Sequence, residues 1–169
     1  MIQTTLVLIK PDGVKRGLIG EILKRFEQRG LKIVGMKLVH ITKDSAAKHY
    51  KEDIAARYGE KARQKLLRYL CSGPVVALAI QGVSAISIVR KIIGSTYPEE
   101  AQLGTIRGDF AHISKAYVNY YDTQTDIEKN VYNLVHASGN EKEASEELSL
   151  WFSKEELFNY ETVHDSHVI

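Results

Sequence analysis

The sequence predicts an α+β domain of the ferredoxin-like class, a split βαβ arrangement with a four-stranded antiparallel sheet and additional helices. The main observation is the order of the hydrophobic patterns along the 169 residues, which run strand, helix, strand, strand, helix, strand. The helix patterns are amphipathic, so the helices are expected to cover the faces of one sheet. A chain of this length is expected to form a single domain over residues 1–169 and to bury roughly two-thirds of its unfolded surface.

The first three elements occupy the N-terminal quarter of the chain. Residues 3–10 are rich in β-branched and aliphatic side chains and stop at Pro11, which predicts a strand followed by a turn. Residues 19–30 carry apolar side chains at helical spacing and end with an arginine and a glycine, which predicts a helix with its C-cap. Residues 31–41 alternate between two sets of side chains, as a second strand does.

The middle of the chain continues the pattern with helices around one buried strand. Residues 44–70 are predicted to be helical, as two helices with a break near Tyr58. The apolar run 75–80 suits an interior strand, and apolar residues recur at helical spacing over 85–92. Residues 94–109 are rich in glycine, threonine and turn formers, which predicts a long ordered loop.

The last strand and helix predict a place for a nucleophile. A short buried strand is expected to end at Val135, so that His136 lies where this strand meets a loop. Asn140 is then expected to cap a helix in which Glu147 lies on the apolar side. A carboxylate in that position needs a partner, and the imidazole of His136 is a candidate, because such a pair fixes the ring and raises its basicity. A core histidine near a glutamate that reaches solvent is the alternative, and these residues alone favour neither.

Composition excludes several classes of protein. The single Cys71 cannot form an intrachain disulfide, and the first residues begin a strand rather than a signal peptide. The most apolar run, 74–80, is far shorter than a membrane span. A formal charge of +2 is too small to predict nucleic-acid binding. We therefore expect a cytoplasmic protein with no membrane segment and no specific nucleic-acid partner.

Phosphate binding is predicted from side chains at the ends of elements. The sequence contains no G-x-x-x-x-G-K-[ST] motif, which excludes a Walker-type loop. Taken singly, each cationic side chain at an element end is more simply a surface residue. Their shared position nevertheless predicts a phosphate clamp, since guanidinium groups bind phosphate oxygens in pairs and stabilise charge during phosphoryl transfer. The candidates are Lys10, Arg90, Thr96 and Arg107.

Six motifs, in order along almost the whole chain, resemble those of nucleoside diphosphate kinases. They are Lys10-Pro11-Asp12-Gly13-Val14 with Arg16-Gly17, His49-Tyr50, Ser72-Gly73-Pro74-Val75, Gly104-Thr105-Ile106-Arg107-Gly108-Asp109-Phe110, Asn133-x-x-His136-x-Ser138 and Glu147-x-x-Leu150-Trp151-Phe152. The resemblance implies an enzyme in which His136 accepts the γ-phosphoryl group of a nucleoside triphosphate and passes it to a nucleoside diphosphate, a ping-pong mechanism.

The resemblance also implies the remaining site residues and the partners. Phosphates and sugar would be bound by Lys10, Tyr50, Arg90, Thr96, Arg107 and Asn133. Ser138 and Glu147 would support the histidine. Mg²⁺ would be carried by the nucleotide phosphates, with no direct protein ligand. A homo-oligomer is implied, with a hexamer favoured and a tetramer as the alternative.

Three features depart from the family pattern. Ala137 and Gly139 stand where the family usually has glycine and aspartate. The family aromatic that stacks on the base has no clean match, and Tyr58 is the only aromatic near its position. Residues 111–132 form an insertion that is predicted to be ordered, with a capping box at 125–128 that would begin a short helix. Its tyrosines would contact either the base or, as we favour, a neighbouring subunit.

Two other functions remain as alternatives. An RNA-recognition module has the same topology, but the sequence lacks its K/R-G-F/Y-G/A-F-V-x-F/Y strand. A silent, regulatory member of the kinase family would bind nucleotides or partners without turnover. The presence of the histidine, the lysine and both arginines favours the enzyme.

Overall fold

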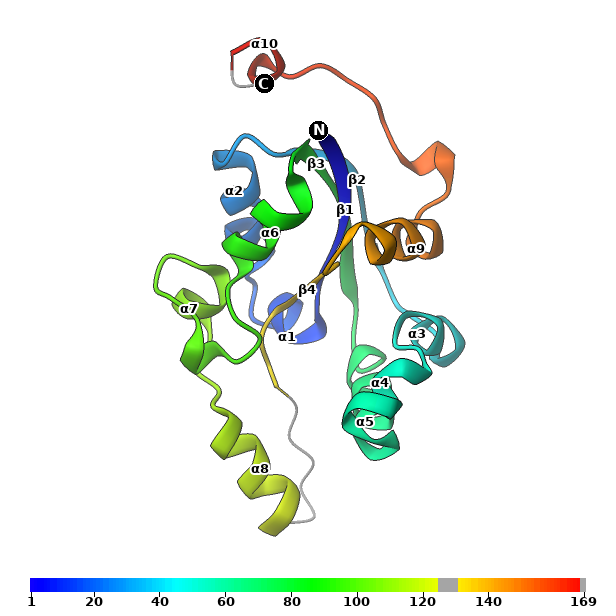
Figure 1. Cartoon of the computed structure of the whole chain (residues 1–169), viewed down its shortest axis with the longest axis vertical. Coiled ribbons are helices and arrows are strands. Elements are labelled where there is room, and N and C mark those ends of the chain that lie inside the picture. Colours follow the sequence, from blue (N-terminus) through cyan, green and yellow to red (C-terminus); the bar gives the residue numbers. More distant parts are fainter. Residues whose placement is uncertain (125–130, 168–169) are drawn as a thin grey trace.

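The computed structural model describes residues 1–124 and 131–167 and has the predicted α+β architecture (Figure 1). The strands form one sheet in the order β2-β3-β1-β4, and every neighbouring pair is antiparallel. Their bounds are β1 Ile2–Ile9, β2 Lys32–Val39, β3 Val75–Val83 and β4 Val135–Ala137. The predicted fold class is therefore confirmed.

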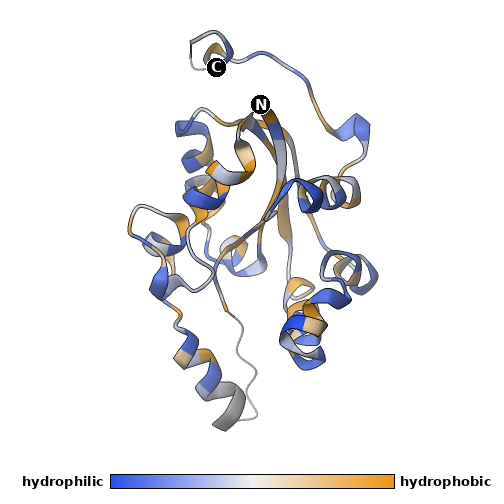
Figure 2. Cartoon of the chain, in the orientation of Figure 1, coloured by the Kyte–Doolittle hydropathy of each residue, from blue (hydrophilic) through white to orange (hydrophobic). Residues whose placement is uncertain are grey.

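Alternation along the central strands divides the core into two layers. Val7 and Ile9 of β1 face a cluster that includes residues of α2 (Ile19–Gln28) and α6 (Ala85–Ile93). Leu6 and Leu8 face the opposite side, against α3 (Lys43–His49), α5 (Glu60–Leu70) and α9 (Glu141–Trp151). Figure 2 shows hydrophobic residues along the strands and on parts of these helices. Both faces of β1 are thus buried, which explains its nearly continuous apolar sequence.

The segment after β1 is a helix rather than the predicted turn. Pro11 occupies the first position of α1 (Pro11–Lys15), where its missing N–H and restricted φ suit a helix start. A Cβ at Gly13 would lie only 2.8 Å from Cγ2 of Ile9 and 3.1 Å from the carbonyl oxygen of Leu134. Glycine at this position therefore lets α1 approach the sheet closely.

The helical region after β2 has one break more than expected. The predicted break near Tyr58 is confirmed, because α4 (Glu52–Tyr58) ends there and α5 begins at Glu60. A second break follows α3, where Tyr50 has φ −94° and ψ 82° and Lys51 is extended. A hydrophobic pattern does not indicate a backbone conformation of this kind. The break allows His49 and Tyr50 to lie beside His136.

The predicted long loop contains two short helices. These are η1 (Pro98–Glu100) and α7 (Ile106–Phe110), which is capped by Thr105. The described part of the insertion includes α8 (Lys115–Gln124), and Ser114 Oγ accepts a hydrogen bond of 2.9 Å from the N–H of Tyr117. The predicted capping box at 125–128 lies outside the described residues.

The C-terminal segment lies along the outer edge of β2. It contains η2 (Lys154–Glu156) and α10 (Val163–His167). The N–H of Phe158 donates to the carbonyl of Val34 at 2.7 Å, and the hydroxyl of Tyr160 donates to the carbonyl of Ile33 at 2.8 Å. These bonds cover part of an edge that would otherwise expose unpaired backbone groups. Over residues 1–124 and 131–167, no helix has both the length and the apolar character needed to cross a membrane.

Candidate active site

His136 lies in the middle of β4 rather than at the end of a strand. β4 runs from Val135 to Ala137, and His136 is paired with Leu8 of β1. The strand was predicted to end at Val135 but begins there, because Leu134 has a φ of +69°, a left-handed conformation that a hydrophobic pattern does not indicate. The N–H of Val135 bonds the carbonyl of Asn133 at 2.7 Å, so Leu134 is the centre of a strained γ-turn.

Glu147 holds the ring of His136 in the predicted way. Nε2 of His136 lies 2.9 Å from Oε1 of Glu147, and Oγ of Ser138 donates to Oε2 at 2.6 Å. Burial alone would raise the pKa of Glu147, but hydrogen bonds from His136 and Ser138, together with the nearby histidines, lower it to about 2. The ionised carboxylate accepts the Nε2 proton, which leaves a lone pair on Nδ1. The two side chains are therefore in contact, as expected for a histidine paired with a carboxylate.

His49, which was not predicted to belong to the site, is a neighbour of His136. Its ring lies 4.5 Å from the ring of His136, at an interplanar angle of 85°. Nδ1 of His49 accepts a hydrogen bond of 3.3 Å from Trp151, and its Nε2 has no hydrogen-bond partner within the described ranges. Burial and a charge on His136 lower the pKa of His49 to about 3, so it is neutral at pH 7. Only its place beside Tyr50 in a motif could have indicated this role.

Tyr50 packs against the same ring. Its centroid lies 6.4 Å from that of His136 and 4.7 Å from that of His49. Burial, followed by the charge on Glu147, raises the pKa of Tyr50 well above its usual range. The phenol therefore stays protonated at neutral pH and can donate a hydrogen bond.

Three of the predicted phosphate and sugar ligands form a connected group. Lys10 Nζ donates to Oδ1 of Asn133, and Nδ2 of Asn133 donates to the carbonyl of Thr96 at 2.6 Å. Lys10 and Asn133 are both buried, whereas Thr96 is exposed. Burial lowers the pKa of Lys10 to about 8, against the charge of Asp12, which raises it. Lys10 is thus mostly protonated at pH 7.

The two predicted arginines meet the free edge of β4. Leu134 and Ser138 bond with Lys10 and with Leu6 of β1, so the carbonyls of Val135 and Ala137 point away from β1. Arg107 Nη2 donates to the carbonyl of Val135 at 2.7 Å, and Arg90 Nη1 donates to that of Ala137 at 3.4 Å. The guanidinium groups therefore lie on both sides of His136 along the strand edge.

Arg107 is buried and makes two further backbone contacts. Its Nε donates to the carbonyl of Asn133 at 3.2 Å, and its Nη1 donates to that of Gly94 at 2.9 Å. Burial, together with the charge of Arg90, lowers the pKa of Arg107 to about 10, which still leaves it cationic at pH 7. These bonds and the one to Val135 use three of the five guanidinium N–H groups, and the other two can bind an anion.

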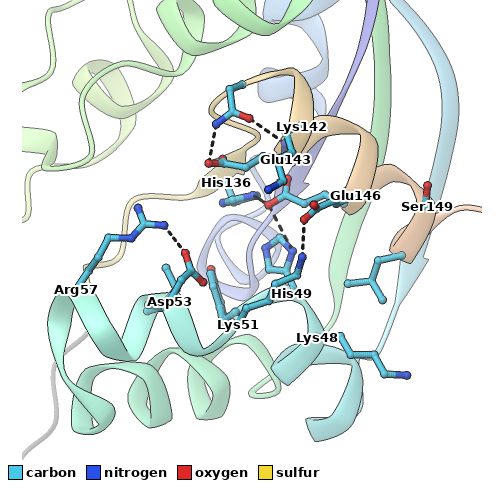
Figure 3. Close-up of a pocket in the computed structure, with 15 residues that line it drawn as sticks. Lys48, His49, Lys51, Asp53, Arg57, His136, Lys142, Glu143, Glu146 and Ser149 are labelled. Atoms are coloured by element: carbon cyan, nitrogen blue, oxygen red, sulfur yellow. Dashed lines mark hydrogen bonds and ion pairs between the residues drawn. The ribbon is translucent and has the colours of Figure 1, made fainter.

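A cavity of about 830 Å³ opens beside the histidines. It lies between the α3–α4 segment and α9, which are bridged by an ion pair of 2.5 Å between Lys51 and Glu146 (Figure 3). His136, Glu147 and the predicted ligand Tyr50 line it, whereas the other predicted phosphate and sugar ligands, Lys10, Arg90, Thr96, Arg107 and Asn133, do not. The structure thus brings the predicted residues together as two groups, which meet at His136 and β4. One group lines or adjoins the cavity and contains Tyr50, Ser138 and Glu147; the other contains the remaining predicted phosphate and sugar ligands.

Comparisons with known proteins agree with the resemblance. The family model described as nucleoside diphosphate kinase matches residues 3–157. The chain belongs to the nucleoside diphosphate kinase family. It is 47% identical over 156 residues to the enzyme of Sulfurisphaera tokodaii, with 92% of each chain covered. It is 42% identical over 163 residues to that of Borreliella burgdorferi, with 95% of this chain and 93% of the relative covered.

Solved structures of the family are similar in fold. A Borrelia burgdorferi nucleoside diphosphate kinase, a transition-state mimic with bound vanadate and ADP, superposes with a TM-score of 0.89 at 41% identity, covering 97% of this chain and 95% of that one. The Halobacterium salinarum enzyme in complex with CDP has a TM-score of 0.82 at 33% identity, covering 100% and 99%. The predicted family is confirmed. So is the predicted class, an enzyme that transfers phosphoryl groups between nucleotides through a phosphohistidine.

The structure explains one departure of this nucleoside diphosphate kinase from the family motifs. Ala137 lies in β4 and has no positive φ, so its backbone does not need glycine. The N–H of Gly139 donates to Oε2 of Glu143 at 2.9 Å, next to the Asn140 cap of α9.

Tyr58, the only aromatic near the position of the family's base-stacking residue, lies at the end of α4 and is 68% exposed.

One cluster in the described part of the chain has the donor groups of a metal site. Ligand atoms of His49, His136 and Glu147 all lie within 4.8 Å of one another. However, His136 Nε2 is bonded to Glu147, and His49 Nδ1 accepts from Trp151. Mg²⁺ prefers oxygen ligands in octahedral geometry, which two imidazoles and one carboxylate do not offer. The cluster therefore does not fit Mg²⁺.

Proposed function

We propose that this chain transfers the γ-phosphoryl group of a nucleoside triphosphate to a nucleoside diphosphate, with His136 as the nucleophile. The observation that carries the proposal is the hydrogen bond of 2.9 Å from Nε2 of His136 to Glu147. It leaves Nδ1 with its lone pair, so that this nitrogen attacks the γ-phosphorus. The N–P bond forms, the bond to the β–γ bridging oxygen breaks, and the nucleoside diphosphate leaves.

The second half of the reaction reverses these steps with a different nucleotide. A β-phosphate oxygen of the incoming nucleoside diphosphate attacks the phosphohistidine, and the N–P bond breaks. The electrons return to Nδ1, and Nε2 keeps its proton on the side of Glu147 throughout. Ser138 holds the other carboxylate oxygen and so supports the histidine indirectly.

Cationic and hydroxyl groups are proposed to bind the nucleotide. Transfer of a phosphoryl group develops charge on its oxygens and on the leaving oxygen, which surrounding cations stabilise. Lys10, Arg90 and Arg107 would supply this charge, and the bound metal would be Mg²⁺ carried by the nucleotide phosphates. Tyr50, Thr96 and Asn133 would add hydrogen bonds to phosphate and sugar.

The remaining parts of the proposal follow from the family. The chain is proposed to act as one domain in a homo-oligomer, with a hexamer favoured over a tetramer. A cytoplasmic location agrees with the single cysteine, Cys71, which leaves no intrachain disulfide to form. Nucleoside triphosphates and diphosphates are the proposed substrates, without specific binding to nucleic acid or membrane.

Incubation with γ-labelled ATP tests the proposal directly. We expect a labelled protein that is stable in base and labile in acid, as a phosphohistidine is, and that loses its label when a nucleoside diphosphate is added. An RNA-binding module or a silent family member would take up no label. Absence of labelling in the presence of Mg²⁺ would contradict the proposed function.

Glu147→Gln is expected to slow phosphorylation of the histidine by about ten-fold, because the neutral amide loses the charge-assisted bond to His136. The fold should be retained, since the two side chains have the same shape. Rapid-quench measurement of phosphohistidine formation at saturating ATP gives the rate. Glu146→Gln is the matched control, because Glu146 is the next residue on α9 but pairs with Lys51. A Glu147→Gln variant that differs only in its melting temperature would show a purely structural role.

A further inference from the structure

The chain enters β4 through a strained turn at Leu134. Leu134 has a φ of +69° and is completely buried. A residue with a Cβ adopts this conformation only where surrounding contacts hold it. Asn133 immediately precedes the turn and His136 follows two residues later, so the conformation of Leu134 sets the relative positions of both. Whatever holds this turn therefore acts on both parts of the site.

The carboxylate of Asp12 is bonded to the turn. Its Oδ2 accepts a hydrogen bond of 3.0 Å from the N–H of Leu134, and its Oδ1 accepts one from the hydroxyl of Tyr69. The carbonyl of Leu134 in turn accepts from the N–H of Lys10 at 2.8 Å. Both backbone groups of Leu134 are thus bonded to the segment from Lys10 to Asp12. The close approach that Gly13 permits keeps this segment against the turn.

Tyr69 connects the carboxylate of Asp12 to Lys10 and Tyr132. It belongs to α5, its ring lies 5.2 Å from Nζ of Lys10, and it makes an edge contact of 5.4 Å with the ring of Tyr132. Burial and the charge of Asp12 raise the pKa of Tyr69, so its hydroxyl remains a donor to the carboxylate at all relevant pH values. The orientation of Asp12 is therefore fixed by a side chain outside its own helix.

Asp12 and the buried ammonium group of Lys10 share Tyr69 as a neighbour. The groups around Lys10 are the carboxylate of Asp12 on α1, the guanidinium of Arg107 on α7, the ring of Tyr69 on α5 and the amide oxygen of Asn133. Asp12 is the one negative charge among these four. It favours the protonated form of Lys10, while burial and Arg107 disfavour it.

We propose that Asp12 is a positioning residue of this kinase: it holds the γ-turn at Leu134, which places Asn133 and His136 relative to each other, and it places a negative charge near Lys10. The proposal rests on the proposed function, because it assigns His136 and Lys10 to phosphoryl transfer. It concerns a residue that acts through its neighbours and needs no contact with the nucleotide.

Three variants separate the two effects of the carboxylate. Asp12→Ala removes both hydrogen bonds and the charge. Asp12→Asn removes the charge but keeps an oxygen that accepts from Leu134, with an amide N–H directed at the oxygen of Tyr69. Tyr69→Phe keeps the charge and the bond to Leu134 and removes only the second anchor. Asp44→Asn, on an exposed position of α3, is the matched control.

Rapid-quench measurement of phosphohistidine formation at saturating ATP is the first readout. We expect Asp12→Ala to lower this rate by about ten-fold or more, the effect of a lost charge-assisted hydrogen bond. Asp12→Asn and Tyr69→Phe should lower it by smaller factors, and Asp44→Asn should not change it. A residue with a purely structural role would change the melting temperature without changing the rate of the folded protein.

The pH profile of kcat/KM is the second readout. The pKa of Lys10 is about 8, so phosphate binding should decrease as the pH rises through this value. Loss of the Asp12 charge lowers this pKa further, and the alkaline limb of Asp12→Asn should therefore move to lower pH. The same limb in Tyr69→Phe should stay near that of the original protein, since the carboxylate remains.

The outcomes separate this proposal from the proposed function. If the unaltered chain forms no phosphohistidine, the proposed function fails. If it does, and Asp12→Ala keeps its rate within about two-fold, the positioning role of Asp12 is refuted. If Asp12→Ala does not fold, the two variants that preserve the bond to Leu134 remain measurable, and an unchanged rate and alkaline limb in both Asp12→Asn and Tyr69→Phe would refute the role of the charge and of the anchor to Tyr69.

Discussion

Replacing His136 with alanine is expected to abolish phosphoryl transfer while ADP binding stays within about three-fold of its original affinity. The imidazole is the nucleophile in the proposed reaction, and an alanine side chain cannot accept a phosphoryl group. Two groups proposed to bind phosphate do not depend on the ring, since Lys10 is held by Asn133 and Arg107 by backbone carbonyls. A coupled assay measures transfer, and isothermal titration calorimetry measures ADP binding.

Two further variants make the His136→Ala result specific. His40→Ala changes an exposed histidine that follows β2 and should leave transfer unaffected. His49→Ala removes the ring that packs 4.5 Å from His136 and should slow transfer without preventing it, because His49 is not the nucleophile. Transfer by the His136→Ala variant above trace level would rule out the proposed mechanism.

The fold and the central pair were predictable because their determinants are local. The longer strands and helices follow from periodicity within short windows, whereas the short helices α1, η1 and α7 do not. His136 and Glu147 are eleven residues apart, and the helix that carries Glu147 begins at the predicted Asn140 cap. A carboxylate on the apolar side of that helix needs a nearby partner, and the chain offers His136 on the preceding segment. This part of the site therefore follows from pattern and chemistry together.

The contacts that complete the site link segments far apart in the chain. The bond from Leu134 to Asp12 spans 122 residues, and the bond from Trp151 to His49 spans 102. No periodicity connects such positions. The sequence does not indicate the left-handed conformation of Leu134 either, because this conformation is normally predicted from a glycine, and the residue here is a leucine. Sequence reasoning therefore found His136 but missed its neighbour His49 and the role that we propose for Asp12.

The arginines show a further limit of sequence reasoning. Position at the end of an element predicted that Arg90 and Arg107 lie near the site. Which carbonyls they meet depends on the pairing of β4 with β1, since the register decides that Val135 and Ala137 point away from the sheet. A hydrophobic pattern of three residues cannot fix that register.

Arg107→Lys is expected to lower kcat by well over ten-fold and also to lower the melting temperature. Arg107 donates to three backbone carbonyls, which hold the Gly94 turn and both residues that flank Leu134. A lysine keeps the charge but has neither the fork nor the reach to bond all three, so buried carbonyls lose their partners as the clamp loses its geometry.

Arg90→Lys is the informative comparison for this second prediction. Arg90 is exposed and makes one long contact of 3.4 Å with Ala137, so its replacement should lower kcat by about ten-fold with little effect on stability. Arg29→Lys, at an exposed site after α2, should change neither quantity. Steady-state kinetics at saturating nucleotide and thermal melts measure both quantities. An unchanged kcat in Arg90→Lys and Arg107→Lys would show that neither arginine acts on the transferred phosphoryl group. Lower stability of Arg107→Lys alone would then mean that the guanidinium serves only the edge of β4.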